Sequence, residues 1–208
     1  MLQQLRPALA GLGCFTVLLG LAYPLAMTGI AQRLFPDAAN GSLVTRDGVP
    51  VGSSLIGQAF AAPIYLHPRP SAAGTGYDGT ASSGTNLGPT SAKLAERLKA
   101  DGAALKAETG AGLLPADAIT TSGSGLDPDI SPAFAALQAP RIASARRIDL
   151  REVKRIIAAG TAGRTFGLLG EPRVNVLAVN LALDAAAAPK SAPASGTPTA
   201  ASAGAPAG

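Results

Sequence analysis

The residues that could perform catalysis or bind a metal are few in this sequence. His67 is the only histidine, and Cys14, the only cysteine, lies in an apolar run near the N-terminus. A zinc site or a serine-histidine-acid triad needs a cluster of such side chains, so the sequence predicts no metal site and no catalytic triad. Asp127 and Asp129 could act as a general acid/base pair. Because they flank Pro128, they are more typical of turns in which Asx side chains bind the backbone.

Two segments rich in glycine and serine could bind an ion through their backbone. They are SSGTNLG (82–88) and TSGSGLD (121–127). Successive backbone N–H groups can hold an anion, and carbonyls can hold a cation. Neither segment has the lysine of a phosphate-binding loop. Tight turns that pack against a partner are the commoner explanation for such segments.

Both segments belong to loops, the first at 68–90 and the second at 120–132. The first loop has almost no apolar periodicity and is longer than the ~12–15 residues usual for a structureless connection. A connection this long is usually functional or held by a partner. We therefore select partner-contact candidates from these loops. They are Arg69, Pro70, Ser71, Asn86, Leu87, Gly88, Pro89, Thr90, Ser122, Gly123, Ser124, Gly125 and Asp127.

Basic side chains are concentrated in one stretch, but the whole chain is only mildly basic. The sequence holds 17 basic and 13 acidic residues. This excess is too small for a nucleic-acid partner, which requires a dense basic face. The basic stretch could contact acidic headgroups or an acidic partner. The interleaved Asp149 and Glu152 favour a solvated helix face instead. Its members are Arg141, Arg146, Arg147, Arg151, Lys154 and Arg155.

A hairpin is predicted before the first loop, and a helix is predicted directly after it. Two extended runs, Ser42–Thr45 and Val49–Leu55, flank the turn signal Asp47-Gly48 and predict a hairpin. Thr90 or Ser91 is expected to cap a helix that continues to about Glu108. Its apolar stripe is formed by Leu94, Leu98 and Leu105.

Three further elements follow the second loop. Ser131 and Pro132 are typical of a helix start, and Pro140 is expected to end or kink that helix. Another helix is predicted from its cap Asp149 to Gly160. The stretch 173–183 alternates so that Asn175 and four apolar side chains would share one face, which predicts a strand.

The strongest pattern in the chain precedes all of these elements. Residues 7–32 carry no charged side chain. About 20 such residues in a helix span the ~30 Å of bilayer hydrocarbon, so the sequence predicts one transmembrane helix. A cleaved signal peptide is the alternative, but the run is longer than a signal's apolar core. Gly13, Gly20 and Pro24 interrupt the run and are candidates for docking against another membrane helix.

The predicted fold class is α+β, with one N-terminal transmembrane helix followed by a single mixed α/β extracytoplasmic domain. We expect a short cytoplasmic tail at 1–6, the transmembrane region at 7–32 and a soluble periplasmic domain at 33–184. Residues 185–208 consist mainly of Ala, Pro, Ser, Gly and Thr, a composition that predicts a disordered tail.

Six stretches follow one another in order from the apolar run to the last predicted element. They are TGIAQRLFPDAANGSL (28–43), VGSSLIGQAF (51–60), RPSA (69–72), GTNLGPTS (84–91), TSGSGLDPDISP (121–132) and LGEPRVNVLAVNLAL (169–183). In this order they resemble the C subunit of the bacterial Kdp-type potassium-transporting ATPase. Together they make a far more specific match than any one glycine-rich fragment.

The resemblance implies an accessory, non-pumping subunit of a high-affinity, ATP-driven potassium import complex in the bacterial inner membrane. Its implied partners are a channel-like A subunit, a P-type ATPase B subunit and a small F subunit. Family members are described as catalytic chaperones that raise the ATP affinity of the catalytic subunit, so ATP is an implied ligand, although no nucleotide motif stands in this sequence. Potassium would be handled by the complex. The alternative from the residues is a membrane-tethered extracytoplasmic enzyme or ligand-binding domain.

Overall fold

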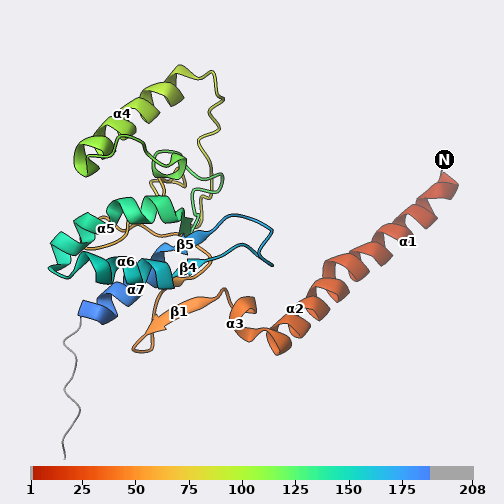
Figure 1. Ribbon diagram of the computed structural model, residues 1–208. Coiled ribbons are helices and arrows are strands. Elements are labelled where there is room, and N and C mark those ends of the chain that lie inside the picture. Colours follow the sequence, from red (N-terminus) through yellow and green to blue (C-terminus); the bar gives the residue numbers. More distant parts are fainter. Residues whose placement is uncertain (1, 188–208) are drawn as a thin grey trace, which may run out of the picture.

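A long N-terminal helix and a mixed α/β domain make up the chain in the computed structural model, which describes residues 2–187 (Figure 1). The mixed architecture with one apolar N-terminal helix agrees with the sequence prediction. The tail predicted from residue 185 begins too early, because α7 continues to Ala187. The rest of that tail lies outside the described residues.

The N-terminal helix is built from consecutive helical stretches. They are η1 (Leu2–Gln4), α1 (Leu5–Phe15), the π-helical η2 (Thr16–Ala22), α2 (Tyr23–Leu34) and the short α3 (Pro36–Ala39). The π-helical stretch ends two residues before Pro24. Proline has no N–H and its ring clashes with the carbonyl four residues earlier, and a wider helical turn is one way to accommodate this. Tyr23 N–H accordingly bonds back to Leu18 O.

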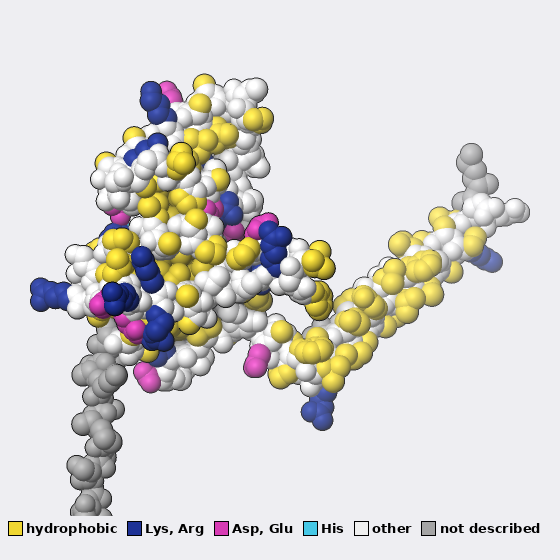
Figure 2. Space-filling model, in the orientation of Figure 1, with side chains coloured by type: hydrophobic (Ala, Val, Ile, Leu, Met, Phe, Trp, Pro, Cys, Tyr) yellow, Lys and Arg dark blue, Asp and Glu magenta, His cyan; other side chains and the backbone are white. Residues whose placement is uncertain are grey.

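This helix has the length and composition of a membrane span. Within the described residues it is the one candidate, running from Leu5 to Leu34 with a mean hydropathy of 1.8 over its most apolar window. Thirty helical residues extend about 45 Å, which exceeds the hydrocarbon thickness. None of that window is buried, and Figure 2 shows an apolar surface along the helix where it projects from the domain. These features fit a single-pass membrane protein.

The first strands form the predicted hairpin. β1 (Leu43–Arg46) pairs antiparallel with β2 (Val49–Ser53). Asp47 and Gly48 both have positive φ, 53° and 78°, as a two-residue type I′ turn requires. The Asp-Gly signal therefore identified this turn correctly.

A small antiparallel sheet lies at the centre of the domain. β5 (Arg173–Asn175) is its middle strand, between β3 (Asp129–Ile130) and β4 (Thr161–Ala162). β3 lies within the second loop, 120–132, so its pairing with β5 fixes the position of that loop.

Three helices begin at the capping residues that the sequence indicated. Ser91 caps α4 (Ala92–Thr109), Ser131 caps α5 (Pro132–Arg146) and Asp149 caps α6 (Leu150–Ala159). Each cap side chain accepts a hydrogen bond from a backbone N–H in the first turn, which satisfies a donor that has no partner within the helix. A short 3-10 turn, η3 (Ala116–Ala118), precedes β3.

Pro140 was predicted to end or kink its helix, and the first of these alternatives is wrong. α5 continues through Pro140 to Arg146. Pro140 and Ala136, whose carbonyl loses its helical donor, both lie on the exposed side. Water can therefore bind that carbonyl, and the buried face of α5 keeps the helix intact.

The predicted strand at 173–183 is also wrong beyond its first three residues. From Val176 to Ala187 the chain forms the helix α7. Its buried face includes Val176, Val179, Asn180 and Leu183, which follow helical spacing. α7 packs with α5 and α6 around one core. The core members are Leu66, Ala118, Ile130, Phe134, Ala135, Ala139, Ile142, Ala143, Val153, Ile156, Ile157, Val174, Val176, Val179 and Leu183.

A set of side chains from α5 and α7, here called the clamp, holds the irregular segment 63–67 in this core. Asn180 is 1% exposed and binds Leu66 twice, through Leu66 N–H to Oδ1 (2.7 Å) and through Nδ2 to Leu66 O (3.0 Å). Gln138 does the same to His67 at 2.8 and 3.0 Å. Buried backbone without a strand partner is thus satisfied by amide side chains.

Two arginines complete the clamp. Arg141 Nη1 donates to the carbonyls of Pro63 and Tyr65. Arg146, whose side chain is 5% exposed, donates to Ile64 O at 2.6 Å and pairs with Asp184 at 2.8 Å. Two of the six residues in the basic stretch therefore hold the backbone inside the domain and are not part of a uniform solvated face.

Candidate functional site

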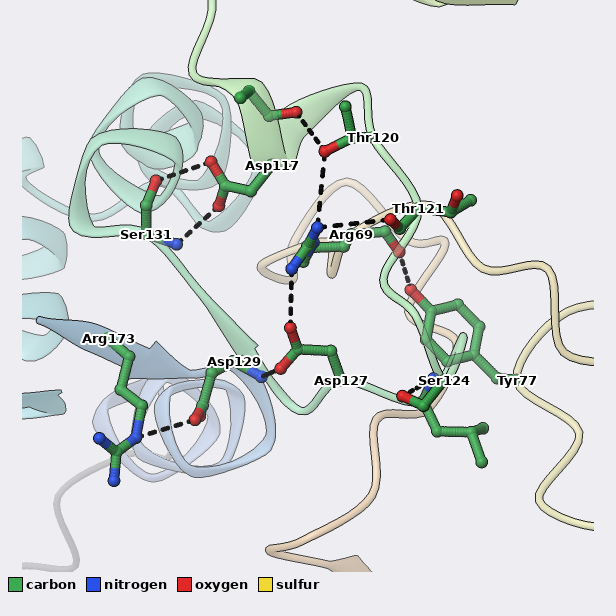
Figure 3. Close-up of polar contacts among 12 residues, drawn as sticks. Arg69, Tyr77, Asp117, Thr120, Thr121, Ser124, Asp127, Asp129, Ser131 and Arg173 are labelled. Atoms are coloured by element: carbon green, nitrogen blue, oxygen red, sulfur yellow. Dashed lines mark hydrogen bonds and ion pairs between the residues drawn. The ribbon is translucent and has the colours of Figure 1, made fainter. Parts of the chain in front are cut away.

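The two long loops meet around Arg69 in an arrangement here called the loop junction (Figure 3). Arg69 Nη1 pairs with Asp127 Oδ2 at 2.9 Å. Its Nη2 donates to Thr120 Oγ1 and Thr121 O at 3.5 and 3.4 Å. One guanidinium thus crosses from the first loop to both ends of the second, using the fork of donors that arginine provides.

Ser71 makes a second connection between the loops. Its hydroxyl donates to Gly125 O at 2.6 Å and accepts the N–H groups of Ala73 and Tyr77. The Tyr77 hydroxyl in turn donates to Arg69 O. Burial, with a smaller contribution from the Asp127 carboxylate, raises the pKa of Tyr77 to about 12, so this phenol remains a hydrogen-bond donor at neutral pH.

The glycine and serine segments touch each other directly. Ser83 N–H and the Ser82 hydroxyl both donate to Ser124 O, at 2.9 and 3.0 Å. Gly125 has φ +69°, and a Cβ added there would lie 2.6 Å from Ser83 O. The second loop therefore needs glycine at this position both for its backbone conformation and for the close approach of the first loop.

Asp127 and Asp129 each bind an arginine and another polar donor. Asp127 Oδ1 accepts Asp129 N–H at 3.0 Å, which is the predicted Asx contact. Asp129 pairs with Arg173 at 3.0 Å and accepts from Asn175. A hollow of about 300 Å³ lies beside these residues, lined by Arg69, Asp117, Asp127, Asp129, Ile130, Ser131, Glu171, Pro172 and Arg173. This hollow is shallow and mixed in charge.

The candidate contact residues divide into two groups. Arg69, Pro70, Ser71, Ser122, Gly123, Ser124, Gly125 and Asp127 lie on the segments that the loop junction joins. The stretch Asn86–Thr90 instead leads into α4, where Leu87 and Thr85 line a hollow of about 620 Å³ with Lys93, Glu96, Arg97 and Ala100. The structure thus gives two separate surfaces where the sequence suggested one set of loop residues.

The side chain and backbone of His67 make structural contacts within the domain. His67 N–H binds the clamp residue Gln138, and its ring Nε2 contacts Ala62 O at 3.1 Å. Burial, and then the positive charge of Arg141, lowers the pKa of His67 below its ordinary 6.5. No group of three His, Cys, Asp or Glu side chains that could hold a metal lies among residues 2–187.

The helix-docking candidates lie on an open surface. Gly13, Gly20 and Pro24 are all exposed. A Cβ at Gly13 would meet no atom within 4 Å, and at Gly20 only the Thr16 methyl at 4.0 Å. Another helix could therefore approach the backbone closely at these positions.

Comparison with known proteins assigns the family. Residues 5–185 match the family described as KdpC: K+-transporting ATPase, c chain. The chain belongs to this family. A potassium-transporting ATPase KdpC subunit of Caulobacter vibrioides is 61% identical over 186 residues, covering 89% of this chain and 94% of the relative. The counterparts in Beijerinckia indica and Bradyrhizobium diazoefficiens are 58% and 53% identical, over 187 and 200 residues. They cover 89% and 90% of this chain, and 95% and 100% of the relatives.

Family membership confirms the resemblance read from the six stretches. Sequence reasoning missed Tyr77, Thr120 and Thr121 in the loop junction, and it missed Asp117 beside the junction. Asp117 holds the start of α5 by accepting Ser131 N–H and hydroxyl at 2.7 and 2.9 Å. The turn signal around Pro115 and Asp117 could have suggested that Asp117 caps a helix. Nothing in the neighbouring sequence indicates that its carboxylate binds Ser131, 14 positions later.

Proposed function

We propose that the chain is an accessory, non-pumping subunit of an ATP-driven potassium import complex, held in the bacterial inner membrane by its N-terminal helix. The observation that carries this proposal is family membership over residues 5–185, together with relatives named as subunits of a potassium-transporting ATPase. The apolar helix Leu5–Leu34 supplies a suitable anchor.

The geometry of the loop junction favours contact with a partner protein over catalysis. Arg69 binds Asp127 across the two loops, and Asp129 binds Arg173 in the sheet. Their charged groups are therefore paired with one another and do not converge on a place where a substrate would react. A rigid, internally bonded surface loses little conformational entropy on binding. In this proposal the junction and the α4 surface contact the channel-like A subunit, the P-type ATPase B subunit or the small F subunit.

The proposed topology places residues 1–6 in the cytoplasm and the domain from residue 33 in the periplasm. Its support is the short N-terminal tail, because short tails carrying a positive charge tend to remain cytoplasmic. An impermeant maleimide applied to intact cells tests this. In a Cys14→Ser background, Leu113→Cys should be labelled, since Leu113 is 92% exposed. Labelling only after cell lysis would reverse the topology.

A consequence of this topology concerns ATP, which is cytoplasmic. We propose that this chain raises the ATP affinity of the catalytic subunit indirectly, through partner subunits or through the tail Met1–Arg6. Equilibrium binding of labelled ATP to the purified full chain should then show no saturation in the millimolar range. Saturable binding would contradict the indirect route.

Assembly provides the decisive experiment. Membranes containing the four subunits should yield all of them when the full chain is pulled down. A chain that lacks residues 1–32 should lose co-purification and potassium-dependent ATPase activity. Full activity with the truncated chain would contradict the role of the anchor, whereas a full chain without companions would contradict the subunit assignment itself.

A further inference from the structure

The loop between β4 and β5, residues 163–172, carries an exposed apolar tip and is here called the apolar finger. Phe166, Leu168 and Leu169 are 90%, 79% and 64% exposed. The tip, residues 165–170, contains no charged side chain. Large apolar side chains gathered at one projecting end mark an interaction site more often than single exposed leucines do.

The finger is a closed turn. Thr165 and Leu169 exchange both backbone hydrogen bonds, at 2.9 and 3.0 Å, and Gly167 N–H donates to Arg164 O. Phe166 and Gly167 both have positive φ, 54° and 75°, which makes the reversal tight. The apolar side chains are therefore held outward by the backbone, and they do not fold back on the domain.

The base of the finger is polar and fixed to the domain. Arg164 Nη2 binds both carboxylate oxygens of Glu171 at 2.8 Å. Asn175, at the end of β5, donates to Ser54 O at 3.1 Å. This bond connects the strand that carries the finger to the segment just after β2, and hence to the part of the chain that leaves the anchor helix.

The finger points to the side of the domain that carries the anchor. In Figure 1 the loop between β4 and β5 projects on that side, and Figure 2, in the same orientation, shows apolar side chains at its end. The anchor itself ends in exposed apolar residues, Leu34 at 63% and Phe35 at 65%, next to Arg33. The exposed apolar end of the anchor and the apolar tip of the finger therefore lie on the same side of the domain in this view.

We propose that the apolar finger inserts its tip into the membrane interface beside the anchor, so that the domain has a second lipid contact. The proposal rests on the membrane span of the proposed function. The hydrocarbon region of a bilayer offers no hydrogen-bond partner, so a loop tip that reaches it must satisfy its own backbone, as the Thr165–Leu169 pairing does. The apolar tip and the charged base also match the gradient from acyl chains to headgroups, because interfacial segments bury their apolar face ~5–10 Å into the boundary between the two.

Fluorescence of the full chain in lipid nanodiscs tests this proposal. An environment-sensitive probe is attached at Phe166→Cys, or at Leu168→Cys so that Phe166 is retained, in the Cys14→Ser background. We expect a blue-shifted emission that lipids with nitroxide labels near the headgroup largely quench, with or without the other subunits. The matched control is Leu113→Cys, equally exposed but in the segment after α4, and it should show neither effect.

Three outcomes decide between the alternatives. An unquenched finger probe would overturn the proposal. A blue shift that appears only with the other subunits, without lipid quenching, would identify the finger as a protein contact and also overturn it. A probe at Leu19→Cys, quenched by deep labels, reports the anchor separately. Its failure would contradict the span on which the proposed function depends, whereas failure of the finger probe alone would leave that function standing.

Discussion

The clamp and the loop junction hold irregular backbone by the same chemistry in different surroundings. In the clamp, Asn180 and Gln138 are 1% and 2% exposed. In the junction, the Arg69 and Asp127 side chains are 24% and 30% exposed. A buried polar group that loses its partner cannot recover a bond from water, whereas a half-exposed one can. The comparison indicates that the clamp contributes mainly to stability and the junction mainly to the shape of a surface.

The largest effect is expected from breaking the clamp with Asn180→Ala. This substitution leaves both Leu66 N–H and Leu66 O without partners inside the core. We expect the free energy of unfolding to fall by about 3–5 kcal/mol, from two unsatisfied groups and the cavity. Urea denaturation of the full chain in detergent measures this. Asn40→Ala removes a similar side chain at an exposed position and is the control; an equal loss in both variants would refute the contrast.

Gly125→Ala attacks the closest approach within the junction. The new Cβ would lie 2.6 Å from Ser83 O and 2.7 Å from Ala73 N, at a backbone φ of +69°. A loss of about 2–3 kcal/mol in the free energy of unfolding is expected, from the left-handed backbone and the overpacking. Gly123→Ala, in the same loop, meets no atom within 4 Å and should change stability little. Comparable losses in the two variants would contradict the close packing of the loops.

The substitution Arg69→Ala is expected to lower the affinity for the other subunits more than the stability of the chain. Because Arg69 and Asp127 are partly exposed, we expect only about 1 kcal/mol to be lost on unfolding. Under the proposed function, the apparent affinity for the other subunits should fall about tenfold, as for a central interface arginine. Co-purification titrations measure the second effect, with Arg155→Ala, at an exposed position of α6, as control. Unchanged affinity would exclude the Arg69 surface as a contact.

The smallest expected effect is a pH dependence of stability that arises from His67, whose backbone the clamp residue Gln138 binds. The pKa of His67 is lower in the folded chain than its ordinary 6.5, because burial and Arg141 disfavour the charged ring. The folded state therefore binds fewer protons than the unfolded state below about pH 6.5. Stability from the neutral ring is complete above that pH and is lost as pH falls through the lowered pKa. In His67→Gln the stability profile between pH 7 and 5 should be flatter; identical profiles would contradict this assignment.

Local signals predicted much of the chain. The Asp47-Gly48 turn and the caps at Ser91, Ser131 and Asp149 each depend on residues within a few positions. A hydrogen bond between neighbours in sequence forms wherever the local backbone allows it. The prediction at 173–183 failed because a short apolar run fits both a strand and a helix. Asn175 was the missed signal, since its Oδ1 accepts Ala178 N–H at the start of α7.

By itself the sequence determined the uncharged span, the local caps and turns, and the family stretches, because these require only adjacent residues. Tertiary structure alone decided that Asn180 faces the core and that Arg69 meets Asp127. Asn180 is acceptable on a buried helix face only because Leu66, 114 positions earlier, brings it one donor and one acceptor. The sequence contains both partners, but packing brings them within bonding distance, since a buried polar group needs a partner whose position the whole fold fixes.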